Sequence, residues 1–149
     1  MNRTWVAWRF LAPFLVLVSS AQAQPPAPQA TLDLGGTSWQ LVRFQGRDGT
    51  TLRPKDKTKY ILEFANDGSL DVRIDCNRGR GTWKAAAASQ LELSPLALTR
   101  AMCPSALNDR LPRDWQSIRS YVVKDGHLLL TAGGGIYEFE PLRAECATP

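Results

Sequence analysis

Apolar and polar residues alternate along most of the chain between residues 37 and 140, and this two-residue period is typical of β-strands with one buried face. Glycine-containing turn sequences interrupt the alternation: NDG at 66–68, KDG at 124–126 and GGG at 133–135. The predicted strands are 37–44, 59–65, 70–76, 81–85, 90–93, 121–123, 127–131 and 136–140. The pattern predicts a mainly β fold of about eight short strands.

One segment has a helical period instead. In residues 108–121, Leu111, Trp115 and Ile118 recur at spacings of four and three, which places them on one face of an α-helix. Pro112 is expected in the first turn of this helix, because the missing amide of a proline costs no hydrogen bond there. The sequence therefore predicts one helix packed on the strands, an α+β fold that is mainly β.

The two strands around the NDG sequence are predicted to pair as a hairpin. The apolar positions of both strands must face one core, and opposed residues keep that parity only if the connecting loop has an odd number of residues. A three-residue loop with Gly68 in the left-handed conformation meets this condition and sets Glu63 opposite Asp71. The same alternation predicts Cys76 on the inner face and Asn77 on the outer face.

The first 23 residues have the three parts of a secretory signal peptide. Arg3 and Arg9 supply positive charge, residues 10–18 are apolar, and small residues precede a cleavage site predicted after Ala23. The apolar run is shorter than the roughly 18 residues that a membrane-spanning helix requires. We therefore expect a cleaved signal peptide and a mature chain in the bacterial periplasm or outside the cell, with no membrane-spanning segment.

After cleavage, the chain is expected to consist of a proline-rich leader (24–35), one domain (36–143) and a short tail (144–149). The formal charge of +4 includes Arg3 and Arg9 of the signal peptide, so the mature chain has a charge of +2. Such a small charge is not typical of nucleic-acid-binding proteins, and no nucleic-acid partner is predicted.

Export would make the three cysteines candidates for disulfide bonding. The favoured pair is Cys76–Cys103, because both residues lie inside the predicted domain whereas Cys146 lies in the tail. This bond would close a loop of about 28 residues, which the chain-entropy model values at about 3.5 kcal/mol. Cys146 is left over, and it is expected to be free, to pair with another molecule or to compete for one of the other two cysteines.

The residues with catalytic potential favour structural roles. Cys76 has a predicted disulfide partner, and His127 beside the KDG turn is more typical of a solvated strand end than of a catalytic base. No helix follows the glycines of NRGRG (77–81), so they do not form a phosphate-binding loop. Glu63 and Asp71 would lie about 5 Å apart, but a solvated outer face explains them better than a catalytic pair. No cluster has metal-ligand spacing, and no catalytic residue, cofactor or metal is predicted.

Two motifs and their order in the chain resemble the META domain, the HslJ-like family of small bacterial envelope proteins. A CN…G.W motif precedes a TRAMC motif, and both follow an early tryptophan in LGGTSWQL (34–41). The resemblance covers residues 34–142 and is carried by Trp39, Cys76, Asn77, Gly81, Trp83, Thr99, Arg100, Met102 and Cys103. It implies structural roles for Trp39, Asn77, Gly81, Trp83 and Thr99.

The resemblance implies a compact antiparallel β-barrel-like domain with one packed helix, and neither catalytic residues nor a cofactor. HslJ-like proteins are associated with heat shock, envelope stress and antibiotic tolerance, and their fold resembles type III secretion pilot proteins whose cracked barrels hold a lipid or a peptide. An envelope protein or an apolar ligand is therefore the expected partner. Asn77 and the glycines after it are expected to turn the chain between two strands. Asp75 stands where the family often has a glycine, which predicts a differently formed bend.

Three hypotheses for function follow, of which an enzyme that uses Glu63 and Asp71 ranks last. The first is a non-enzymatic, stress-related binding or assembly factor of the envelope. The second is a secreted inhibitor of a lytic enzyme such as lysozyme, with the loop 45–59 inserted into the active site, although the Arg and Lys residues of this loop suit a basic lysozyme poorly. For the indoles, two arrangements stay open: Trp39, Trp83 and Trp115 all fill the core, or Trp83 and Trp115 flank a groove that accepts an acyl chain or an apolar peptide.

Overall fold

The computed structural model describes residues 33–87 and 89–143 of the 149-residue chain. The predicted signal peptide, most of the proline-rich leader and the tail with Cys146 lie outside the described residues. The predictions of cleavage after Ala23 and of the state of Cys146 therefore stay predictions.

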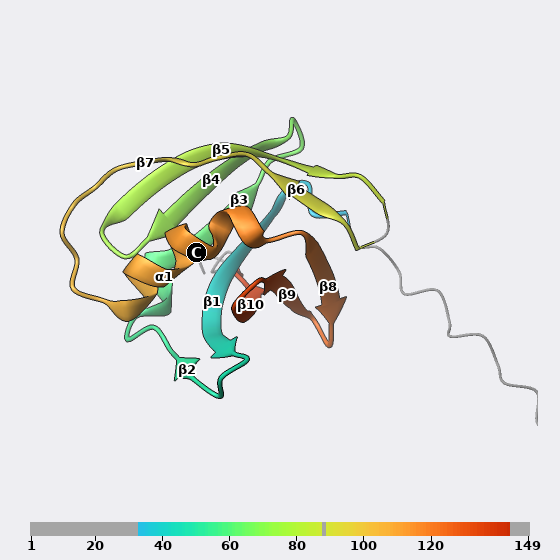
Figure 1. Cartoon of the computed structure of the whole chain (residues 1–149). Helices are drawn as coiled ribbons and strands as arrows, with labels where there is room; N and C mark the ends of the chain where they lie inside the picture. Colours follow the sequence, from blue (N-terminus) through green and yellow to red (C-terminus); the bar gives the residue numbers. More distant parts are fainter. Residues whose placement is uncertain (1–32, 88, 144–149) are drawn as a thin grey trace, which may run out of the picture.

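The described residues form an antiparallel sheet that curves into a nearly closed barrel with one helix, which confirms the predicted fold class (Figure 1). The strand order is β6-β5-β4-β3-β1-β10-β9-β8, while β2 pairs with β1 and β7 with β5. The strands are β1 (Thr37–Gly46), β2 (Thr51–Leu52), β3 (Tyr60–Phe64), β4 (Ser69–Ile74), β5 (Asn77–Ala85), β6 (Leu91–Leu93), β7 (Ala97–Leu98), β8 (Ser120–Lys124), β9 (His127–Ala132) and β10 (Gly135–Pro141). The helical elements are η1 (Lys57–Lys59), α1 (Ala106–Asp114) and η2 (Trp115–Ser117), of which η1 and η2 are 3-10 turns.

Backbone hydrogen bonds between the two ends of the sheet close the barrel. β6 and β8 are the outermost strands of the sheet order, yet the N–H of Leu91 donates to the carbonyl of Arg119 (2.9 Å) and the N–H of Tyr121 to that of Ser89 (2.9 Å). Both edges therefore have partners for part of their length, which satisfies backbone groups that an open edge would expose.

Two of the predicted turns have the expected backbone. Glu63 lies opposite Asp71 in the β3–β4 hairpin, and Gly68 has a φ of 82°, so the register and the left-handed glycine are both confirmed. In the β8–β9 hairpin, Asp125 (φ 52°) and Gly126 (φ 78°) form a two-residue turn. Positive φ at both central residues is the geometry that Asp-Gly sequences favour between antiparallel strands.

The turn between β4 and β5 lies earlier than predicted. Asp75 and Cys76 form it, and Asn77 is already the first residue of β5. Asn77 is opposite Ile74, which points inward, and directly opposed residues of an antiparallel pair lie on the same face. Asn77 is therefore buried and Cys76 is exposed. The predicted inner position of Cys76, the outer position of Asn77 and the turn at Asn77 and its glycines are all wrong.

The helix begins and ends before its predicted bounds of 108–121. Leu111, Trp115 and Ile118 are at most 2% exposed, so all three are buried. Only Leu111 lies in α1, because Trp115 begins η2 and Ile118 after it has extended backbone, so the prediction that one helix carries all three is wrong. Pro112, however, is the seventh residue of α1 and does not lie in its first turn. Because a proline donates no backbone hydrogen bond, it weakens the helix at this point, and the chain passes into the 3-10 turn η2 after two more residues.

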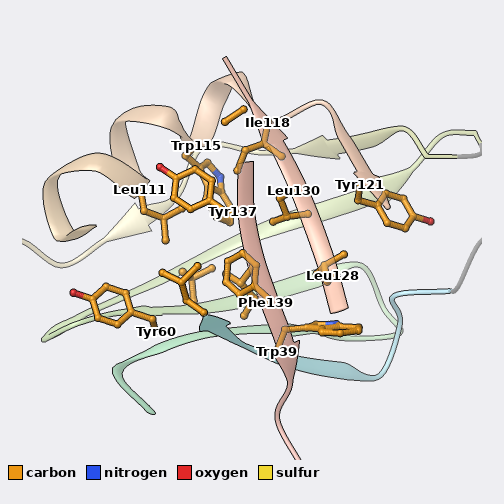
Figure 2. Packing of buried hydrophobic residues seen from close by; sticks show 14 of the residues in the cluster. Trp39, Tyr60, Leu111, Trp115, Ile118, Tyr121, Leu128, Leu130, Tyr137 and Phe139 are labelled. Carbon is orange, nitrogen blue, oxygen red and sulfur yellow. The ribbon is translucent and has the colours of Figure 1, made fainter. Parts of the chain in front are cut away.

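Aromatic and aliphatic side chains fill the inside of the barrel, and Figure 2 shows Trp115, Leu130, Tyr137 and Phe139 among those grouped in its middle. The largest of the fully buried side chains are those of Trp115, Tyr137, Phe44, Phe64 and Phe139. Helix α1 adds Leu107 and Leu111 to this core. Leu34, which lies within the predicted leader, is fully buried as well, so the core includes residues before Gly36.

Candidate functional site

The side chain of Asn77 is a buried polar hub between β5, the TRAMC segment (99–103) and helix α1. Its Nδ2 donates to the carbonyl of Ala101 (3.1 Å) and to Oδ1 of Asn108 (3.0 Å), and it lies 3.3 Å from Sγ of Cys103. Its Oδ1 accepts hydrogen bonds from the N–H of Ala101 (2.7 Å) and the hydroxyl of Thr99 (3.1 Å). Asn77 is only 3% exposed, so these bonds replace the water that the amide loses on burial.

The partners of Asn77 are themselves anchored. Asn108 Nδ2 donates to the carbonyl of Cys103 (3.2 Å), and the hydroxyl of Thr99 accepts from the N–H of Arg78 (2.9 Å). The hub therefore fixes a segment that lies more than 20 residues away in the sequence. Asparagine was expected to bond nearby backbone as a turn residue, and the long-range role has no local sequence signal apart from the co-occurrence of the two motifs.

A disulfide joins Cys76 to Cys103, as predicted, with the two Cα atoms 6.1 Å apart. Its two ends differ in environment, because Cys103 is 9% exposed whereas Cys76 lies in the exposed turn. Beside the buried end, Met102 is fully exposed. The disulfide and the Asn77 hub together hold the TRAMC segment on the barrel.

Two glycines of β5 let the chain between β6 and β7 pass close to the strand. A Cβ at Gly81 would lie 2.9 Å from Oγ of Ser94 and 3.2 Å from the side chain of Leu96. A Cβ at Gly79 would lie 2.8 Å from the side chain of Leu98. Gly81 thus has a structural reason to lack a side chain, and Ser94 uses the space to accept a hydrogen bond from the N–H of Thr82 (2.8 Å).

Each of the three tryptophans in the described part of the chain has a hydrogen-bond partner for its indole N–H. Trp39 (3% exposed) donates to the hydroxyl of Thr37 at 2.7 Å, and Trp115 (2% exposed) donates to the carbonyl of Ser94 at 3.0 Å. Trp83 is half-buried and donates to the carbonyl of Ala65 at 3.1 Å. These bonds support structural roles for all three tryptophans.

The structure contains a cavity beside Trp115 but does not bring Trp83 to it, so the predicted groove between the two indoles is not formed as expected. A cavity of about 320 Å³ beside Trp115 is lined by Pro95, Leu96, Leu98, Arg100, Pro112 and Gln116, and Trp83 is not among its lining residues. The Trp83 ring packs edge-on against Phe64 instead, with 5.4 Å between ring centroids. The structure therefore brings Trp115 to this cavity and places Trp83 in a separate aromatic pair.

Two of the groups considered for catalysis, Asp71 and His127, are held in side-chain pairs. Asp71 accepts a hydrogen bond from Arg80 (2.7 Å), while Glu63 opposite it is exposed. His127 Nδ1 lies 2.8 Å from a carboxylate oxygen of Glu138. Within residues 33–87 and 89–143, no group of three or more His, Cys, Asp or Glu side chains is placed to hold a metal ion.

An open hollow of about 1100 Å³ lies over β1, β9 and β10, and Gln40, His127 and Glu140 are among its lining residues. Lys57 Nζ lies 3.0 Å from Oε1 of Glu140, and Gln40 donates to the same oxygen at 2.8 Å. The hydrogen bond from Lys57 lowers the pKa of Glu140 below its ordinary value. This carboxylate is therefore held in its charged form near neutral pH.

The segment 45–59 is not one long loop. β1 continues to Gly46, β2 folds back on β1 with Leu52 opposite Phe44, and η1 follows before β3. What remains between β1 and β2 is a short turn at 47–50. The inhibitor hypothesis thus lacks its long insertion loop in this part of the structure.

A model of the META domain family matches residues 31–143. Among solved structures, the fold is similar to that of a protein from Burkholderia xenovorans studied by NMR, with a TM-score of 0.64 and 20% identity over 87% of this chain and 98% of that one. It is also similar to a DUF4847 family protein from Bacteroides vulgatus, with a TM-score of 0.53 and 19% identity over 72% of this chain and 93% of that one. No curated protein matches significantly. None of the helices in the described ranges is long and apolar enough to span a bilayer.

Proposed function

The chain belongs to the META domain family, and from this premise we propose that it is an exported, non-enzymatic envelope protein that acts as a stress-related binding or assembly factor. The observation that carries the proposal is the Cys76–Cys103 disulfide, which ties the TRAMC segment to the β4–β5 turn. Structural disulfides persist in oxidising compartments such as the periplasm, in agreement with the predicted signal peptide. The association with envelope stress comes from the resemblance to HslJ-like proteins.

The bonding of two candidate catalytic groups supports a role without catalysis. Cys76 is consumed in the disulfide, and the Asp71 carboxylate is paired with Arg80. A thiol nucleophile needs a free sulfur, and a general base needs a free acceptor atom beside its substrate. Both of these groups have a structural partner instead.

The packed interior supports binding at the outer surface. An acyl chain inside the barrel would have to displace buried rings such as Phe44, Phe64 and Phe139, which fill the interior as side chains do in small barrels. On the outside, Met102 is fully exposed next to the disulfide, and exposed methionines adapt to varied apolar partners. The proposed partner surface is therefore the outer face around Met102.

Expression of the full chain in a bacterium, followed by cell fractionation and intact-mass measurement, tests the export step. We expect a periplasmic product that begins at Gln24 and whose mass is lowered by the two hydrogens of one disulfide. Peptide mapping without reduction should link Cys76 to Cys103. A full-length cytoplasmic product with reduced thiols would contradict the proposal.

Cross-linking in the periplasm, followed by mass spectrometry of proteins and lipids, tests the partner surface. Met102→Ser should reduce capture of the partner several-fold without changing the melting temperature, because the side chain contributes no core contact. Ile136→Ser is the matched control, since Ile136 is the other large hydrophobic residue exposed in the described chain, at 43%. Equal capture by both variants would move the partner surface away from Met102.

Titration of the mature protein with fatty acids, followed by tryptophan emission, tests the packed interior. We expect unchanged emission, because Trp39 and Trp115 are enclosed by core side chains. A saturable shift that Trp115→Phe abolishes, with the fold intact, would instead support an apolar ligand beside the helix.

A further inference from the structure

Arg73 on β4 and Arg78 on β5 are direct partners across the two strands, on the outer face of the barrel. The Cβ atoms of directly opposed residues lie about 4.5–5.5 Å apart, and like charges in this position destabilise a sheet. Within residues 33–87 and 89–143, neither guanidinium forms an ion pair with a carboxylate. Neither arginine of the pair is thus neutralised by a directly bonded carboxylate of the described chain.

The acidic residues on either side of this pair are committed elsewhere. Asp71, two residues before Arg73, is paired with Arg80 at 2.7 Å. Asp75, two residues after Arg73, lies 3.9 Å from Lys59. β4 and β5 therefore carry the Asp71–Arg80 ion pair in the row next to Arg73 and Arg78. The two arginines, in contrast, have no bonded carboxylate in the part of the chain that the structure describes.

A surface hollow of about 340 Å³ lies at this point, and its lining residues are Ile61, Glu63, Asp71, Val72, Arg73, Arg78 and Gly79. Glu63 lies on β3 and forms no ion pair with any side chain in the described ranges. It is one row from the arginines, since Glu63 is opposite Asp71 while Ile61 is opposite Arg73. Glu63 is thus a diagonal neighbour of Arg73, about 7–8 Å away, and Arg78 is one strand further. Among the described residues, the hollow presents two unpaired guanidinium groups, the unpaired carboxylate of Glu63 and the carboxylate of Asp71, which is paired with Arg80.

We propose that this hollow binds an aminoalkyl phosphate, with the phosphate group on Arg73 and Arg78 and the amine on Glu63. Phosphate suits the pair better than a carboxylate, because one guanidinium already satisfies both oxygens of a carboxylate, whereas a tetrahedral phosphate has oxygens for two guanidinium groups. Ile61 is opposite Arg73 and lies next to Glu63 on the outer face of β3, where it contacts the short carbon linker. The inference goes beyond the proposed function, because the arrangement of these charges does not depend on export of the protein.

NMR titration of the isotope-labelled domain tests the site with three soluble probes: phosphoethanolamine, inorganic phosphate and ethanolamine. We expect saturable shifts of the Arg73 and Arg78 amides with phosphoethanolamine, weaker binding of phosphate and no binding of ethanolamine alone. Vesicles that contain phosphatidylethanolamine form a separate arm of the experiment. This arm distinguishes a lipid headgroup from a free aminoalkyl phosphate as the ligand. Binding of neither source would overturn the proposal.

Three variants separate this site from general positive charge. Arg73→Gln or Arg78→Gln should weaken phosphoethanolamine about tenfold, which corresponds to about 1.4 kcal/mol. Glu63→Gln should reduce its affinity to that of phosphate. Arg113→Gln is the matched control, because Arg113 is also exposed and unpaired in the described chain but lies on α1.

The stability of the arginine variants distinguishes lost binding from lost folding. Since the pair repels itself, Arg78→Gln should keep or slightly raise the melting temperature. Equal weakening by Arg113→Gln, or phosphoethanolamine affinity unchanged in Glu63→Gln, would overturn the proposal. Either result would leave the export and disulfide experiments unaffected.

Discussion

At the scale of single residues, the buried side chain of Asn77 connects β5 to two other segments of the chain. Its amide uses both donor hydrogens and its carbonyl accepts twice, and every partner belongs to the TRAMC segment or to α1. A buried amide without such partners would cost stability, so the residue specifies where this segment lies.

Replacement of Asn77 by alanine should lower the free energy of unfolding by about 2–4 kcal/mol, because it leaves buried donors and acceptors of the TRAMC segment unpaired. Urea denaturation measures this loss. The control is Gln45→Ala, an exposed strand position, which should stay within about 0.5 kcal/mol of the parent protein. Equal stability of the two variants would contradict the role of the hub.

Asp75 has a φ of 57°, in the left-handed region, at the turn position where the family often has a glycine. Aspartate tolerates the left-handed region better than most residues, whereas a β-branched side chain does not. Asp75→Gly should therefore keep the melting temperature, and Asp75→Val should destabilise the protein by about 1–2 kcal/mol. Thermal unfolding followed by circular dichroism compares them; a stable valine variant would exclude backbone strain at this turn.

At the scale of elements, a small polar cluster ties α1 to the barrel. The hydroxyl of Tyr137 on β10 donates to Oδ2 of Asp114 at 2.8 Å, and Arg110 Nε lies 3.1 Å from the same oxygen. The Arg110 guanidinium also lies over the ring of Phe44 on β1, 4.4 Å from its centroid. The helix end is thereby connected to two strands that are neighbours in the sheet.

Tyr137→Phe should cost about 1–2 kcal/mol, since one hydrogen bond is lost while Asp114 keeps its partner Arg110. Asp114→Ala should cost more, because it leaves the buried Tyr137 hydroxyl without an acceptor and Arg110 without an anion. Chemical denaturation of the two variants gives the order. The reverse order would show that the helix is held by its apolar face alone.

The disulfide connects two elements that the sheet does not pair, the β4–β5 turn and the segment before α1. Removal of the cross-link by the double change Cys76→Ser and Cys103→Ser should reduce stability by about 3.5 kcal/mol, and reduction of the parent protein should have the same effect. Denaturation with and without a thiol reductant measures both. A reductant effect that persists in the double variant would reveal a different cross-link.

At the scale of the whole molecule, alkaline pH is expected to unfold the barrel. Burial raises the pKa of Tyr60, Tyr121 and Tyr137, the three tyrosines of the chain, and for Tyr137 the hydrogen bond to Asp114 adds to the effect. A pKa raised in the folded state means that the stabilisation is complete below the unfolded value of about 10 and is lost as the pH rises above it.

Tyrosinate absorbance and far-ultraviolet circular dichroism, recorded together during a titration, measure this loss. We expect the tyrosines to ionise together with the loss of β structure, above the pH at which free tyrosine ionises. Ionisation near pH 10 with an unchanged circular dichroism spectrum would show that the rings are accessible in the folded protein.

Much of the fold is determined by local sequence patterns. Alternation reveals the strands and their inner faces, and the three-residue NDG loop sets Glu63 opposite Asp71. The helical spacing of Leu111, Trp115 and Ile118 identifies three buried side chains, although the α-helix ends before the last two. These features follow from the sequence because strand and helix periods repeat over a few residues, so neighbours in the chain are sufficient to specify them.

Only the tertiary structure decided the features that depend on distant partners. A two-residue turn at Asp75 and Cys76 exchanged the predicted faces of Cys76 and Asn77, because it set Asn77 opposite an inward residue. The amide of Asn77 is satisfied by Ala101, Thr99 and α1, and its burial has meaning only when that segment lies against β5. The paired arginines likewise emerge only from the β4–β5 register, since opposition across strands is a property of the folded sheet and not of either strand alone.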